Sequence, residues 1–191
     1  MPAAIQPADS EGPALPPPFV PDDRDALNRP GRLILAVEDD SKFAATLVRL
    51  AHDLDFDCVV AGTAEDALQM ARACLPNGIL LDISLPDVSG LSVLERLKRD
   101  PQTRHIPVHV VSAVERMQVA LELGAVGYAL KPATREMLVE AIGQLEERHR
   151  RSMRRLLIVE DDRQLRENLT LLLARDGLEI VAAGSVDEAL E

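Results

Sequence analysis

The residue with the clearest chemical potential is Asp82, which follows the apolar run Gly78–Leu81. A turn containing Pro86 and Asp87 comes directly after it. An apolar run of this length, closed by turn residues, is typical of a strand buried on both faces of a parallel sheet. Ligands of open α/β sheets bind at the carboxyl ends of the strands. We therefore expect Asp82 to lie at a ligand-binding edge.

Four further polar residues follow or end apolar runs and could join Asp82: Glu38, Asp39, Ser112 and Lys131. Three carboxylates held together repel one another, and a hard divalent cation that prefers oxygen ligands removes that cost. Mg²⁺ fits best, because it keeps water positions that a phosphate could take. Lys131 could then pair with a phosphoryl group, and the Ser112 hydroxyl could hydrogen-bond to it.

The elements that must position these residues alternate between short strands and helices, which predicts a doubly wound parallel sheet. This is an α/β class, flavodoxin-like, with five strands in the order 2-1-3-4-5. The expected strands are 33–37, 58–61, 79–82, 106–112 and 128–131, and the expected helices are about 41–54, 64–75, 90–99, 115–123 and 134–151.

Composition bounds the rest of the chain. Residues 1–31 hold eight of the 13 prolines, and we expect them to be a disordered tether. A net charge of −11 disfavours general nucleic-acid binding. Cys58 and Cys74 lack a CxxC spacing, which favours free thiols in the cytoplasm. No apolar run is long enough to span a membrane, and no signal peptide is evident.

An internal repeat follows the first five βα units. A shift of 122 positions aligns Glu38-Asp39-Asp40 with Glu160-Asp161-Asp162 without a gap. Residues 151–191 therefore repeat the first strand, helix and strand and the start of a second helix, but they contain no counterpart of Asp82. We expect Glu160 and Asp161 to form an acidic pair without an acceptor. We also expect this incomplete copy to be loosely packed or paired with another chain, because half a sheet leaves an open edge.

The pattern at these strand ends resembles the receiver domains of two-component signalling over about residues 32–150. The resemblance implies that Asp82 accepts a phosphoryl group from a histidine kinase or a histidine phosphotransfer protein. It implies that Mg²⁺ is bound by Glu38, Asp39, Asp82 and the Ser84 backbone carbonyl. It further implies that Lys131 assists catalysis before a cis Lys131–Pro132 bond, and that Ser112 and Tyr128 form the conformational switch. The repeat suggests kinship with hybrid sensor histidine kinases.

The implied chemistry is self-phosphorylation followed by slow autodephosphorylation, not enzymatic turnover, because neither Ser84 nor Val114 is a good base for a hydrolytic water. Two alternatives stay open. One is a pseudo-receiver or scaffold that acts without phosphate. The other is a phosphohydrolase with an aspartyl nucleophile, although such an enzyme normally has a second acid where this chain has Ser84.

Other polar clusters have simpler interpretations. His52 is expected on a helix surface, and His105 and His109 lack zinc-site spacing with the cysteines. The arginines at 148, 150, 151, 154 and 155 are interpreted as a solvated linker. Any dimer is expected through the fourth helix, fifth strand and fifth helix, or through the incomplete copy. The sequence does not identify the downstream protein partner.

Overall fold

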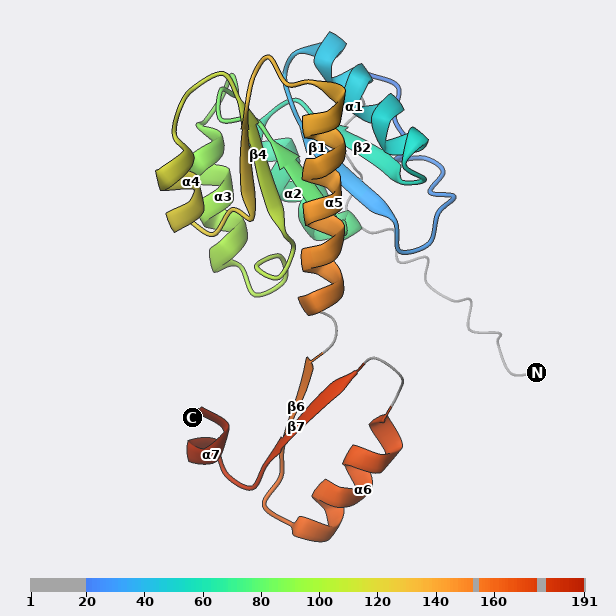
Figure 1. The fold of residues 1–191 in the computed structure, drawn as a ribbon, viewed down its shortest axis with the longest axis vertical. Helices are drawn as coiled ribbons and strands as arrows, with labels where there is room; N and C mark the ends of the chain where they lie inside the picture. Colours follow the sequence, from blue (N-terminus) through green and yellow to red (C-terminus); the bar gives the residue numbers. More distant parts are fainter. Residues whose placement is uncertain (1–19, 153–154, 175–177, 191) are drawn as a thin grey trace, which may run out of the picture. The chain divides into compact units, whose positions relative to one another are not determined.

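The computed structural model describes residues 20–152, 155–174 and 178–190. Contacts divide the chain into two compact units, Met1–Leu145 and Glu146–Glu191. Figure 1 shows the helices and strands of both units. Within the described residues, none of the helices combines the length and apolar character needed to cross a membrane.

The first unit is built on a parallel sheet of five strands in the order β2-β1-β3-β4-β5, as expected. Every adjacent pair of strands is parallel, so all carboxyl ends meet at one edge of the sheet. The strands are short and aliphatic, which suits a sheet covered on both faces. They are β1 (Leu33–Val37), β2 (Asp57–Ala61), β3 (Gly78–Leu81), β4 (Val108–Ser112) and β5 (Gly127–Leu130).

Five helices connect and cover these strands (Figure 1): α1 (Ser41–Asp53), α2 (Ala64–Cys74), α3 (Gly90–Arg99), α4 (Met117–Glu122) and α5 (Arg135–Ser152). Both α1 and α2 are capped, because the Asp40 side chain accepts hydrogen bonds from the first turn of α1 and Thr63 does the same for α2. Helix α5 begins in the first unit and ends in the second.

Two apolar cores lie on opposite faces of the sheet. One contains buried side chains of α2, α3 and α4, and the other contains those of α1 and α5. Alternate residues of one strand enter different cores: Leu35 belongs to the first and Ile34 to the second. The observed layers are therefore helix, sheet, helix, which holds the strand ends rigidly.

An N-terminal strap, residues 20–31, packs along β2. The Val20 side chain is buried in the core that contains α1 and α5, and the Asp23 backbone N–H donates to the Cys58 carbonyl at 3.0 Å. Gly31 turns the chain into β1 with a φ of 69°, which glycine adopts at little cost. We expected a disordered tether over residues 1–31, so the ordered strap differs from that expectation; residues 1–19 lie outside the described residues.

The second unit contains a two-stranded parallel sheet of β6 (Arg155–Val159) and β7 (Glu179–Ala183), with helices α6 (Arg163–Leu173) and α7 (Val186–Leu190). Its strand register repeats that of the first unit at the same shift of 122: Ile34 pairs with Cys58, and Leu156 pairs with Ile180. The burial does not repeat. Leu35 is fully buried, whereas its counterpart Leu157 is 50 % exposed.

Candidate functional site

Three carboxylates meet at the carboxyl edge of the first sheet. Glu38 and Asp39 directly follow β1, and Asp82 directly follows the neighbouring strand β3. One oxygen from each side chain lies within 4.8 Å of those of the other two. Glu38 and Asp82 are 2 % and 5 % exposed, whereas Asp39 is open to solvent. A cation about 2.1 Å from each oxygen could gather this set after a small side-chain movement, so the residues fit Mg²⁺.

Lys131 places its ammonium group among these acids. Its Nζ lies 2.6 Å from Asp82 Oδ2 and 2.7 Å from Glu38 Oε2. Lys131 comes from the end of β5, which is two strands away from β3 in the sheet. The ion pairs therefore join residues 49 and 93 positions apart in the chain. The Lys131 ammonium group thus lies where it could also pair with an anion that binds next to Asp82.

The surroundings of Asp82 fix its backbone as well as its carboxylate. The Ser84 N–H donates to Asp82 Oδ1 at 3.0 Å. Gly90, the first residue of α3, packs so closely that a Cβ there would meet the Asp82 carbonyl oxygen at 2.0 Å. The sequence interpretation missed this role of Gly90, because a close approach between residues eight positions apart leaves no periodic signal.

Burial and hydrogen bonding act against each other on the ionisable groups. Burial raises the pKa of Glu38, and the nearby Lys131 only partly offsets that effect. Burial would also raise the pKa of Asp82, but hydrogen bonds from Lys131, the Ser84 N–H and Ser112 outweigh it and lower the pKa. Burial would lower the pKa of Lys131, yet its bonds to Asp82 and Glu38 raise it. The site therefore holds ionised Asp82 beside ionised Lys131 at neutral pH.

The two expected switch residues lie on adjacent strands next to this cluster. Ser112 ends β4 and is fully buried, and the Val114 N–H lies 3.4 Å from its hydroxyl oxygen. Tyr128 lies in β5 and is partly exposed. Its hydroxyl donates to the Val114 carbonyl and accepts from the Arg116 N–H at 3.1 Å. Both residues thus contact the same β4–α4 loop.

Several other polar residues and one peptide bond that the sequence analysis considered also have defined positions in the structure. The Lys131–Pro132 peptide bond is cis, as expected. Asp87, which was expected in a turn, accepts hydrogen bonds from the first two N–H groups of α2 and thereby helps to cap that helix. His109 is buried within β4. Glu160 and Asp161 follow β6 in the second unit; among the described residues, the group of three acids close enough to hold a metal does not include them.

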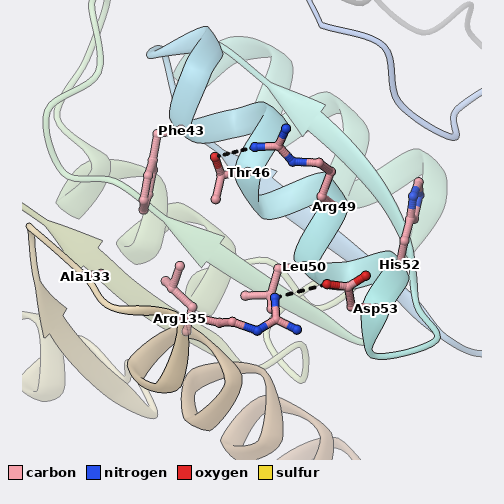
Figure 2. A pocket seen from close by; sticks show the side chains of 9 residues that line it. Phe43, Thr46, Arg49, Leu50, His52, Asp53, Ala133 and Arg135 are labelled. Carbon is pink, nitrogen blue, oxygen red and sulfur yellow. Dashed lines mark hydrogen bonds and ion pairs between the residues drawn. The ribbon is translucent and has the colours of Figure 1, made fainter.

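A groove of about 610 Å³ lies beside the acidic cluster, between α1 and the start of α5. Figure 2 shows Phe43 at one end and His52 at the other, and the ion pair between Arg135 of α5 and Asp53 of α1. The Phe43 ring lies beneath the Lys131 ammonium at 4.6 Å. The groove and the acidic cluster therefore adjoin at Phe43, a contact that the sequence interpretation missed.

A doubly wound sheet with acids after β1 and β3, a serine ending β4 and a lysine after β5 defines the receiver class of signalling domain. The family model for the response regulator receiver domain matches residues 34–143. The chain belongs to this family.

Individual relatives agree with that assignment. The chain is 36 % identical over 141 residues to the response regulator PleD of Caulobacter vibrioides, covering 70 % of this chain and 28 % of PleD. It is 33 % identical over 115 residues to the polar-differentiation response regulator DivK of Brucella ovis, covering 57 % of this chain and 91 % of DivK. The chain spans little more than a quarter of the length of PleD.

A solved structure has the same fold. It is the receiver domain of the sensor histidine kinase PA1611 of Pseudomonas aeruginosa, described with a magnesium ion coordinated in its active-site cleft. The TM-score is 0.56 at 22 % identity, over 61 % of this chain and 98 % of that one. The likeness shows the fold alone. PleD and DivK are response regulators, and they do not support the expected kinship with hybrid sensor histidine kinases.

Proposed function

We propose that the protein is a phosphoacceptor receiver in which Asp82 takes a phosphoryl group from a histidine kinase or a histidine phosphotransfer protein. The observation that carries this proposal is the Asp82 carboxylate at the end of β3, 2.6 Å from Lys131 and within a cluster of three acids. An isolated turn aspartate needs neither partner. The family membership supports a kinase donor in general terms.

The metal in this proposal is Mg²⁺, held by Glu38, Asp39, Asp82 and the Ser84 backbone carbonyl. Bound there, the ion would neutralise charge on the phosphoryl oxygens. The chemistry of the donors supports the assignment, since all are hard oxygen ligands. The magnesium described for the PA1611 receiver, which has the same fold, is in keeping with it.

The proposed reaction is an in-line displacement. An Asp82 carboxylate oxygen attacks the phosphorus of a phosphohistidine, an O–P bond forms, and the N–P bond to the imidazole breaks. The imidazole leaves with the electron pair and regains a proton from solvent. Lys131 exchanges part of its pairing with Asp82 for a phosphoryl oxygen, so positive charge is already in place and little reorganisation is needed.

The proposed output is a rearrangement around Ser112 and Tyr128. The Ser112 hydroxyl would donate to a phosphoryl oxygen, and movement of Ser112 toward that oxygen would lengthen its 3.4 Å contact with the Val114 N–H. Since Tyr128 holds the same loop through Val114 and Arg116, movement of the loop releases the tyrosine. The face of α4, β5 and α5 would then change, which is a local charge event read by a protein surface. The downstream protein that reads this face is not identified.

Labelling with acetyl phosphate and Mg²⁺ tests the proposal. The wild-type protein should gain one phosphoryl group per chain, and Asp82→Asn should gain none. Asp87→Asn is the matched control, because Asp87 also follows β3 but caps α2. Absence of labelling in the wild-type protein would favour a scaffold that acts without phosphate. Turnover of a small phosphate ester beyond one equivalent would favour a phosphohydrolase. A phosphoryl half-life of seconds would contradict the slow autodephosphorylation that we propose.

The second unit supports a narrower proposal, that it is the beginning of a second receiver without an acceptor. The repeated register of β6 and β7 and the acids Glu160 and Asp161 after β6 favour this origin. We propose that this unit is loosely packed or paired with another chain, because Leu157 and Val159 are half exposed. High amide protection throughout it in a monomer would contradict this. We also propose a cytoplasmic location, which rests on the free cysteines.

A further inference from the structure

Strand β2 is one of the two edge strands of the receiver sheet, because among the described strands only β1 pairs with it. In this strand Asp57 and Ala61 direct backbone groups toward β1 and the residues joined to it: the Asp57 N–H donates to the Arg32 carbonyl, and the Glu38 N–H donates to the Ala61 carbonyl. Alternate residues of a strand direct their backbone groups to opposite sides. Cys58 and Val60 therefore present their N–H and C=O groups to the outside.

Three consecutive residues of the N-terminal strap satisfy all four of these outward groups. Asp23 accepts from the Cys58 N–H at 2.8 Å, and its own N–H donates to the Cys58 carbonyl at 3.0 Å. Asp22 accepts from the Val60 N–H at 2.8 Å, and Arg24 donates to the Val60 carbonyl at 2.8 Å. Three of the four bonds come from side chains, so the strap ends the hydrogen-bond ladder without offering a new strand.

Further contacts anchor the strap within this cap and beyond it. The Asp22 and Arg24 side chains form an ion pair at 2.6 Å and are 0 % and 4 % exposed. Farther along, the buried Asp57 carboxylate accepts from the backbone N–H groups of Asn28 and Arg29 at 2.7 Å each. These contacts tie the strap to the start of the strand as well as to its centre.

A further contact links the strap to helix α1. His52 Nε2 lies 2.7 Å from Asp23 Oδ2, the same oxygen that caps Cys58. In Figure 2, His52 lies at the end of α1 that is farthest from Phe43. The strap therefore holds the β2 edge and α1 together through a single carboxylate oxygen.

We propose that the N-terminal strap is an intramolecular cap that closes the β2 edge against strand pairing with a second copy of this chain. An uncapped edge strand presents unpaired N–H and C=O groups, and an identical strand is the most available partner for them. The occupant excluded by the strap is thus the β2 strand of another molecule, aligned antiparallel about a two-fold axis. This role lies outside residues 34–143 of the family model and is independent of phosphorylation.

Amide exchange in the full chain tests the cap. In the wild-type protein the Cys58 and Val60 amides should exchange at least about a hundredfold more slowly than unprotected amides. Rapid exchange of these two amides in the wild-type protein would overturn the proposal, and this result needs no variant to fold.

The decisive variant is Asp22→Ala with Arg24→Ala, which removes both partners of the buried ion pair and leaves no uncompensated charge. Asp25→Ala, at an exposed position of the same strap, is the control. In dilute double variant, the Val60 amide should exchange at least about tenfold faster than in the control. Sedimentation should show a dimer that grows with concentration, and Val60 exchange should slow again as the dimer forms. A variant that stays monomeric at every concentration, or a dimer in which Val60 stays fast, would overturn the proposal.

Discussion

The Lys131 ammonium lies 2.6 Å from the Asp82 carboxylate and thereby occupies the space between a proposed metal ligand and the groove beside α1. Lys131 neutralises part of the negative charge of Asp82 and Glu38, which a bound cation would also neutralise. The two positive charges should therefore compete. That competition makes the site weaker for metal alone and better prepared for metal together with a phosphoryl group.

Replacement of Lys131 by alanine should consequently separate metal binding from phosphorylation. Loss of a positive charge beside Asp82 and Glu38 should tighten Mg²⁺ binding about tenfold, while labelling by acetyl phosphate should fall by about a hundredfold. Calorimetric titration with MgCl₂ measures the first effect. Lys42→Ala, an exposed change in the first turn of α1, is the control. Unchanged Mg²⁺ affinity would contradict the competition.

Metal binding should also appear as stability. A ligand that binds only the folded state adds about 2.7 kcal/mol to the unfolding free energy at one hundred times its Kd. Thermal unfolding of the wild-type protein should therefore shift upward with MgCl₂, and Asp39→Asn should lose most of that shift. Asp187→Asn, an exposed acid of the second unit, should keep it. An equal shift in the Asp39 variant would remove this residue from the metal site.

Two glycine substitutions should have opposite effects on stability. Gly90→Ala places a Cβ against the Asp82 carbonyl, where backbone must move, and should cost at least about 2 kcal/mol. Gly143→Ala lies in α5 with no atom within 4 Å of the new Cβ. It should stabilise the protein by about 0.5–1 kcal/mol, because alanine has the better helix propensity. Urea unfolding monitored by circular dichroism measures both.

The strap should give the protein a defined acid sensitivity. Burial would raise the pKa of Asp57, but hydrogen bonds from Arg29 and Asn28 outweigh it and lower the pKa. A carboxyl whose pKa is depressed on folding contributes stability above its unfolded pKa of about 3.9 and loses it as pH falls through the folded value.

Asp57→Asn should therefore destabilise the protein most at neutral pH. The difference in unfolding free energy from the wild-type protein should shrink as pH falls below about 4. Urea titrations at a series of pH values check this. A difference that is constant, or that grows as pH falls, would show that the carboxylate charge contributes nothing through these bonds.

Tyr128→Phe should loosen the β4–α4 loop without disturbing the core. The phenyl ring keeps the apolar contacts, but the bonds to Val114 and Arg116 disappear. The Arg116 amide should then exchange about tenfold faster, while the Val110 amide, within β4, should keep its rate. An unaltered Arg116 rate would show that the loop holds its position without the tyrosine.

The strand ends could be predicted because each strand carries its own signal. The apolar runs at 33–37 and 79–81 must be buried, and a residue that directly follows such a run must reach the edge of the sheet. The carboxyl edge of the sheet is therefore reached by Glu38, Asp82 and Lys131, and this placement does not depend on the conformation of the loops. Their roles in phosphorylation are proposals, because their positions alone do not demonstrate a reaction.

Contacts between distant segments left no such signal. Asp22 and Asp23 directly follow Pro21 in the sequence, yet they bond to backbone groups 38 and 35 positions away, respectively. The fourth helix is shorter than the expected 115–123, because the Arg116 backbone has a non-helical φ of −134° and α4 begins at Met117. The Tyr128 hydroxyl bonds to the Arg116 N–H and to the Val114 carbonyl just before this start. Both differences arise from partners that become neighbours only after folding.

The repeated register gives the chain an internal comparison. Leu35 and Leu157 stand at equivalent positions of strands paired in the same way, yet among the residues that the structure describes only the strand of Leu35 has a second neighbour. The described residues thus contain the same strand-helix-strand arrangement once within a five-stranded sheet and once within a two-stranded sheet. A comparison of amide protection in β1 and β6 would show how much the pairing of β1 with β3, the strand that precedes Asp82, adds to the cooperativity of unfolding.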